Sequence, residues 1–216
     1  MKHVSGGVTA AKGFQAASTA AGIKYEGRED MALLYSEVPC AAAGTFTTNL
    51  VKAAPVLWDR KIVKEKGTAQ AVVINSGIAN ACTGPEGLEA CAKSAEAAAE
   101  ALHIPADYVF VASTGVIGQP IPTDRITAGV KQMAPQLSGG TEAGAAAAKA
   151  IMTTDTVSKE AAVTFEVKGK TVTLGGMCKG SGMIHPNMCT MLAFLTTDAS
   201  ISREMLQEAL SDIVQD

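Results

Sequence analysis

Apolar and polar positions along the chain switch repeatedly between the periods of strands and helices. Runs of apolar and β-branched residues predict strands at 31–36, 42–48, 70–75 and 108–112. The last two are each followed by a glycine-containing loop and then by a helical pattern, over 85–102 and from Thr123. Two strand–loop–helix units in succession indicate a layered α/β fold.

Turn and capping residues delimit further elements. Pro55 fits the first turn of a helix that reaches about residue 66 and stops at Gly67. An alanine-rich helix is expected over 141–152, with Thr141 as its N-cap.

Alternating segments near the C-terminal end predict a hairpin. The strands are 161–167 and 171–174, and a Lys-Gly-Lys turn joins them. The last helix is expected to begin at Ser202. It carries one apolar face, formed by Met205, Leu206, Ala209, Leu210 and Ile213.

The stretch 179–195 changes from a polar loop to an apolar run. Glycines and Pro186 punctuate its first half, whereas 189–195 is apolar apart from Thr190 and short enough for a buried strand. Such a junction can hold the Thr190 hydroxyl rigidly. Taken alone, the pattern also describes a surface loop before a core strand, with Thr190 present for its β propensity.

Composition narrows the class of protein. The 216 residues suggest one domain, or one and a part, and 47% apolar content suits a compact globular protein. A net charge of −3 without a Lys/Arg run favours neither nucleic acid nor an anionic membrane as a partner. We find no signal peptide and no membrane span. The five cysteines show no CxxC pair, so we expect them to be reduced, in the cytoplasm.

Residues 179–192, of the form KGSGMIxPNMxTML, resemble the self-cleavage motif of the ornithine acetyltransferase family (glutamate N-acetyltransferases of arginine biosynthesis). In that family the Thr at the position of Thr190 cuts the chain on its own N-terminal side and then accepts the acyl group. The residue before the cut is usually Ala, and Cys189 here adds a second nucleophile. A Thr hydroxyl needs a base, and the α-amine that the cut would release can serve, because it titrates near pH ~8.

The motif STGVIG at 113–118 also resembles the family's, where the Thr and Gly matching Thr114 and Gly115 stabilise the oxyanion. A loop that leaves a strand can direct N–H groups at one point, and Gly115 permits unusual dihedral angles. The alternative is Ser113 as a conventional nucleophile, but its flanks lack the Gly-x-Ser-x-Gly elbow.

Thr153 and Lys179 resemble the family's substrate-binding Thr and Lys, and Thr190 would also contact substrate. Lys179 can pair with a substrate carboxylate or lower the pKa of a neighbouring amine. Without the resemblance, they read as a Thr at a helix end and a solvated Lys. The glycine-containing run 75–84 precedes a helix, so an anion could bind there, but the run lacks dinucleotide and P-loop spacings. It resembles a run near the family's active site, and we therefore interpret it as pocket lining.

The three histidines have no metal-ligand spacing, so we expect no metal, and no cofactor beyond acetyl-CoA as a possible substrate. The resemblance implies an α-β-β-α sandwich, divided here into 1–189 and 190–216. The family's chain continues past Asp216, so we expect the first half of a precursor, or a truncated form, that associates with its own C-terminal β chain as a hetero-oligomer.

The implied activity is acetyl transfer from N2-acetylornithine to glutamate through an acetyl-Thr190 intermediate. Two alternatives stay open. One is a self-processing aminopeptidase or amidase of similar fold, and the other is a non-catalytic remnant that only binds the missing half. The motifs at 113–118 and 179–192 favour the acetyltransferase over the peptidase.

Overall fold

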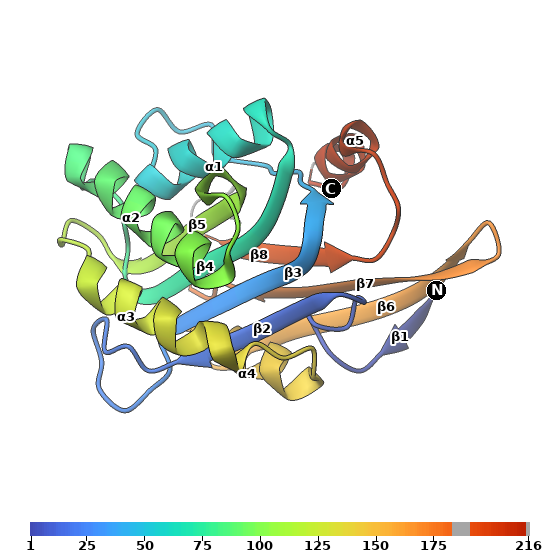
Figure 1. The fold of residues 1–216 in the computed structure, drawn as a ribbon, viewed down its shortest axis with the longest axis horizontal. Coiled ribbons are helices and arrows are strands. Elements are labelled where there is room, and N and C mark those ends of the chain that lie inside the picture. The colour runs from blue at the N-terminus through green and yellow to red at the C-terminus, as the bar shows by residue number, and fades with distance from the viewer. Residues whose placement is uncertain (183–190, 215–216) are drawn as a thin grey trace.

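A computed structural model describes residues 1–182 and 191–214, and they form two four-stranded sheets (Figure 1). The first sheet has the order β2-β3-β4-β5 and consists of Phe14–Thr19, Met31–Ala41, Thr68–Ile78 and Val109–Val116. The second has the order β1-β6-β7-β8 and consists of Lys2–Val4, Lys159–Val167, Lys170–Lys179 and Leu192–Thr197. Within each sheet neighbouring strands are antiparallel, except that β4 and β5 are parallel.

Five α-helices connect and cover these strands: α1 Ala54–Glu65, α2 Gly84–Leu102, α3 Thr123–Met133, α4 Thr141–Ala150 and α5 Arg203–Ile213. Short 3₁₀ turns lie at Ala106–Tyr108 and Ala134–Gln136. The helical pattern from Thr123 and both strand–loop–helix units are confirmed. The layered α/β fold expected from the sequence is therefore confirmed as well.

Two apolar cores hold the layers together. One fills the space between the first sheet and helices α1–α3, around the fully buried side chains of Leu33, Val109 and Met133. The other lies on the opposite face of that sheet, where Ile74 meets Met177 of the second sheet and alanines of α4. Because small side chains dominate α4, its backbone can pack closely between the sheets.

Side chains of α1 cover the open edge of β5. The Trp58 indole N–H donates to the carbonyl of Val109 at 2.9 Å, and the Asp59 Oδ1 accepts from the N–H of Val111 at 2.9 Å. Burial raises the pKa of Asp59 well above its usual range. The strand β5 carries the candidate oxyanion residues at an edge of the sheet. Backbone groups at its open side thus form hydrogen bonds with side chains instead of with another strand.

Local signals placed most element ends correctly. Gly67 stops α1 with φ +62°, and Lys168 and Gly169 turn the β6–β7 hairpin with φ +49° and +76°. Ser202 caps α5 by accepting from the N–H of Met205 at 3.3 Å. The apolar face predicted for α5 exists, but none of its side chains is buried in the described part of the chain.

Three local predictions are wrong. The strand expected to be buried over 189–195 corresponds to β8, which runs from Leu192 to Thr197 and exposes Leu195. Residues 42–48 form no strand, because β3 pairs with β4 only as far as Ala41 opposite Thr68, and residues beyond it meet no described neighbouring strand. Thr141 is the first residue of α4, and the N-cap position is taken by Gly140, without a side-chain hydrogen bond. Strands β1 and β2 were not predicted at all.

The segment after β8 is attached to the C-terminal end of α1 and to Gly44. The Arg203 guanidinium donates to the carbonyls of Val63 and Lys64 at 2.7 Å each, at the C-terminal end of α1. The Gln207 amide oxygen accepts from the N–H of Gly44 at 3.0 Å. Helix α5 is therefore held against α1 mainly by polar contacts to backbone groups, beside the start of the 42–53 connection (Figure 1).

Candidate active site

A buried lysine brings together residues that lie far apart in the sequence. Lys179 is the last residue of β7, and its Nζ donates to the hydroxyl oxygens of Thr153 at 2.7 Å and Thr114 at 3.1 Å. Thr114 is 3% exposed and Lys179 is 6% exposed. The structure thus rejects the reading of Lys179 as a solvated side chain and places three candidate site residues in one cluster.

The electrostatics of this cluster centre on the Lys179 ammonium. Burial lowers the pKa of Lys179 below its usual value. The carboxylate of Asp155 opposes that effect, and the nearby Lys159 ammonium adds to it. A buried cation with only two hydroxyl oxygens as described hydrogen-bond partners keeps one donor position for a further oxygen, such as that of a carboxylate.

Gly115 lies directly after Thr114 with φ +137°, a conformation that other residues rarely adopt. It pairs in register with Gly77 of β4, and an added Cβ at Gly115 would overlap the carbonyl group of Gly77 and come within 2.7 Å of the Ile78 nitrogen. Only glycine therefore fits at position 115, where the backbones of β4 and β5 approach each other closely.

Asp155 is a residue that sequence reasoning missed. Its side chain is fully buried and accepts from the N–H of Gly180 at 2.7 Å, the N–H of Thr153 at 3.2 Å and the Lys159 ammonium at 2.7 Å. Burial alone would raise the pKa of Asp155, but these hydrogen bonds outweigh it and lower the pKa to about 2. No local pattern distinguishes Asp155 from a surface carboxylate, because its partner Gly180 is remote in sequence.

Ser113 does not have the surroundings of a serine nucleophile. Its hydroxyl donates to the Asn75 side-chain oxygen at 2.6 Å, and the Asn75 amide donates to the carbonyl of Ile78 at 2.8 Å. In the same run, Ser76 donates to the carbonyl of Ala150 at 2.7 Å. These buried side chains brace the backbone of β4 and β5, so the first part of the 75–84 run is scaffold and not pocket lining.

The predicted cleavage residues, Cys189 and Thr190, lie outside the described residues. The described residues that flank them are close to the cluster: Leu192, two positions after Thr190, pairs in register with Lys179. Across the same strand pair, a Cβ at Gly180 would be 3.4 Å from the side chain of Met191. Along the chain, the predicted cleavage residue Thr190 therefore lies two positions before β8, the strand whose first residue pairs with the buried Lys179.

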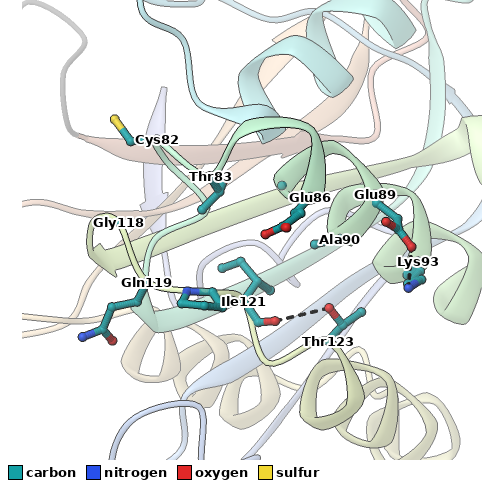
Figure 2. Close-up of a pocket in the computed structure, with 12 residues that line it drawn as sticks. Cys82, Thr83, Glu86, Glu89, Ala90, Lys93, Gly118, Gln119, Ile121 and Thr123 are labelled. Carbon is teal, nitrogen blue, oxygen red and sulfur yellow. Dashed lines mark hydrogen bonds and ion pairs between the residues drawn. The ribbon is translucent and has the colours of Figure 1, made fainter.

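Two of the surface pockets in the described part of the chain differ in their relation to the lysine cluster. A pocket of about 590 Å³ borders the cluster through Thr153 and Asp155, and Arg28 and Lys149 also line it. The other, of about 340 Å³, lies between the start of α2 and the loop after β5 (Figure 2). That second pocket includes Cys82 but none of the candidate site residues.

Within residues 1–182 and 191–214, no group of three or more His, Cys, Asp or Glu side chains is placed to hold a metal ion. In the same ranges, no helix is long and apolar enough to cross a membrane. The described cysteines, Cys40, Cys82, Cys91 and Cys178, are all free thiols.

Solved structures and curated sequences resemble this chain closely. The crystal structure of the arginine biosynthesis bifunctional protein ArgJ from Bacillus halodurans superposes with a TM-score of 0.80 at 45% identity, over 87% of this chain and 95% of that one. Ornithine acetyltransferase from Mycobacterium tuberculosis, solved in complex with ornithine, gives a TM-score of 0.77 at 46% identity, over 87% and 96% of the two chains.

A more distant likeness concerns the fold alone. An L-aminopeptidase D-Ala-esterase/amidase from Ochrobactrum anthropi, 14% identical, superposes with a TM-score of 0.58 over 96% of this chain and 68% of that one.

Sequence comparison shows the family directly. The arginine biosynthesis bifunctional protein ArgJ of Symbiobacterium thermophilum is 57% identical over 214 residues, which are 98% of this chain and 52% of that relative. The chain thus spans about half the length of the curated relatives it matches. The ArgJ family model matches residues 15–216, and the chain therefore belongs to the ArgJ family.

Proposed function

We propose that the protein of which this chain is part transfers an acetyl group from N2-acetylornithine to glutamate, in arginine biosynthesis. The observation that carries the proposal is the buried Lys179 ammonium that holds Thr114 and Thr153 beside the strand entered just after Thr190. The relatives support the same reaction, since they include arginine biosynthesis bifunctional proteins and an ornithine acetyltransferase solved with ornithine.

In this proposal the acetyl group moves in two steps. The Thr190 hydroxyl attacks the acetyl carbonyl, and its proton passes to the Thr190 α-amine. Thr114, through its hydroxyl and its backbone N–H, and Gly115, through its backbone N–H, stabilise the oxyanion. The amine then returns the proton to the departing ornithine amine. Glutamate next takes the acetyl group from the Thr190 ester. Lys179 and Thr153 would hold the α-carboxylate that both amino acids share.

The α-amine of Thr190 requires a cut between Cys189 and Thr190, which would divide the chain into 1–189 and 190–216. Two coverage figures support such a division among relatives: this chain covers 95% of the ArgJ crystal chain from Bacillus halodurans but only 52% of the curated ArgJ sequence from Symbiobacterium thermophilum. The crystallised chain is thus much shorter than the relative's sequence.

We also propose that the two pieces remain associated with the rest of the relatives' length as a hetero-oligomer. The outward face of the second sheet exposes Leu195 and Val167, and α5 exposes Met205 and Ile213. Such apolar side chains on one sheet face and one helix are suited to contact with a further chain segment. The free thiols support a reducing compartment, and we place the reaction in the cytoplasm.

Kinetics of the protein expressed from its full-length gene test the reaction. We expect parallel double-reciprocal lines and, when glutamate is withheld, a mass gain of one acetyl group on the Thr190 fragment. Intersecting lines with no acetylated fragment would contradict the covalent role of Thr190. Acetyl-CoA offered in place of acetylornithine tests whether it is a second donor.

The alternative is a self-processing aminopeptidase or amidase, which the fold likeness to the Ochrobactrum enzyme favours. It predicts hydrolysis of small peptide amides without acetyl transfer to glutamate. A remnant that only binds its missing half would show neither activity. Assaying acetyl transfer to glutamate and hydrolysis of peptide amides in one series therefore distinguishes the three candidate functions.

A further inference from the structure

Asp155 connects the two segments that carry the lysine cluster. Thr153 lies in the connection between α4 and β6, and Lys179 ends β7. The Asp155 Oδ2 accepts from the N–H of Thr153 in the first segment, and Oδ1 accepts from the N–H of Gly180 in the second. One buried carboxylate thus fixes the backbone on both sides of the Lys179–Thr153 hydrogen bond.

A second contact reinforces this connection. The hydroxyls of Thr154 and Ser181 lie 2.8 Å apart, next to the Asp155–Gly180 contact. Gly180 itself has φ +153°, so the chain turns as it leaves β7. Two consecutive residues of the 151–158 connection therefore hold the two residues that follow Lys179.

We infer that Asp155 is a positioning residue: its carboxylate sets the distance between Thr153 and Lys179 and so aligns the carboxylate-binding end of the acyl-transfer site. This inference rests on the proposed function. Among the described residues, Asp155 forms hydrogen bonds with Thr153, Lys159 and Gly180 and none with Thr114. It acts through the backbone of Thr153 and Gly180 and through its charge near Lys179.

The charged groups around Lys179 give the inference a signature that a purely structural role would lack. The carboxylate of Asp155 raises the pKa of Lys179, whereas the ammonium of Lys159 lowers it. Arg28, Glu29 and Lys149 line the adjoining pocket, and Arg28 donates to the carbonyl of Met152. We call the fall of kcat/KM at high pH the alkaline limb. Removing Asp155 or Lys159 should therefore shift this limb in opposite directions.

The experiment compares variants of the full-length protein in the acetylornithine–glutamate assay. Asp155→Asn should lower kcat/KM about 100-fold, mainly through KM, since misplacement of a binding group by about 1 Å has that order of effect. Its alkaline limb should move to lower pH. Lys159→Met, which keeps both backbone contacts of Asp155, should retain kcat and move the limb to higher pH.

Asp198→Asn is the matched control. Asp198 also accepts from two backbone N–H groups of separate segments, Lys12 at 3.2 Å and Thr173 at 2.7 Å, but it has no hydrogen bond to those site residues that the structure describes. This variant should leave KM and the limb unchanged.

If Asp155→Asn has an unchanged KM and an unmoved limb, the inference is wrong. The proposed function still stands in that case, provided that the wild type transfers the acetyl group. Absence of transfer by the wild type would instead reject the proposed function itself. If Asp155→Asn does not fold, Lys159→Met decides: an upward shift of its limb supports the inference, and an unmoved limb or a collapsed kcat overturns it.

Discussion

Gly115 and Gly77 sit opposite each other on parallel strands so closely that no side chain fits between them. The contact is between backbone atoms, and it lies next to Thr114, the residue of β5 that accepts a hydrogen bond from Lys179. Any displacement of Gly115 would therefore also displace its neighbour Thr114.

Gly115→Ala should lower the free energy of unfolding by about 2–4 kcal/mol and abolish most transfer, because a Cβ combines overpacking with a positive φ. Urea unfolding and kcat measure the two effects. Gly118→Ala is the control: φ is +78° there and nothing lies within 4 Å of the added Cβ, so only about 1 kcal/mol should be lost.

Thr114→Ala should reduce turnover by about two to three orders of magnitude, the usual effect of losing one oxyanion-site group. The buried hydroxyl also accepts from Lys179, and Thr114→Ser keeps that oxygen, so Ser should restore most of kcat. A Thr114→Ala enzyme with wild-type turnover would leave only the backbone N–H of Thr114 in the mechanism.

Lys179 should set an alkaline limit on activity. Because burial lowers its pKa below the ordinary lysine value of 10.5, kcat/KM should fall as the pH rises through that lowered pKa and the ammonium loses its proton. Lys179→Met should remove this limb and raise KM about 10- to 100-fold, as expected for a lost charge-assisted hydrogen bond. A limb that persists in Lys179→Met would have to be assigned to another group.

Asp155 should contribute to stability in a defined pH range. Its pKa is lowered from 3.8 to about 2, so the contribution is present above pH 3.8 and is lost as the pH falls through about 2. The shift corresponds to about 2 kcal/mol. Urea unfolding, followed through the fluorescence of Trp58, should show Asp155→Asn less stable than wild type at pH 7, with the difference shrinking in acid.

Self-cleavage should depend on the hydroxyl of Thr190. Thr190→Ala is expected to remain one chain, whereas Thr190→Ser should still be cut, and intact mass measures both. Cys189→Ala should also be cut, because Ala is the family's usual residue before the cut. Two fragments from Thr190→Ala, or a block only in Cys189→Ala, would move the nucleophile away from Thr190.

The elements that sequence predicted well are those with local determinants. Pro55 and Gly67 delimit α1, and Lys168 and Gly169 form the hairpin turn, without help from distant residues. Strand formation depends on a partner, which explains why 42–48 is irregular although it contains β-branched residues.

The residues of the candidate site also differ in whether local sequence is enough to identify them. Thr114, Thr153 and Lys179 were found through motifs, and the structure brings them into hydrogen-bond contact. Asp155 could not be found, because its role depends on Gly180, which follows β7 and is remote in sequence. The link between the two was visible only in three dimensions.

The hydrogen bonds from Arg203 to the end of α1 bear on how the processed protein would assemble. Together with the pairing of β8 with β7, they join the segment beyond residue 190 to elements on the other side of the predicted cut. In the uncut chain these contacts re-form as a first-order event. After the cut, refolding becomes a second-order association, and the unfolding midpoint of the processed protein should depend on its concentration, unlike that of uncut Thr190→Ala.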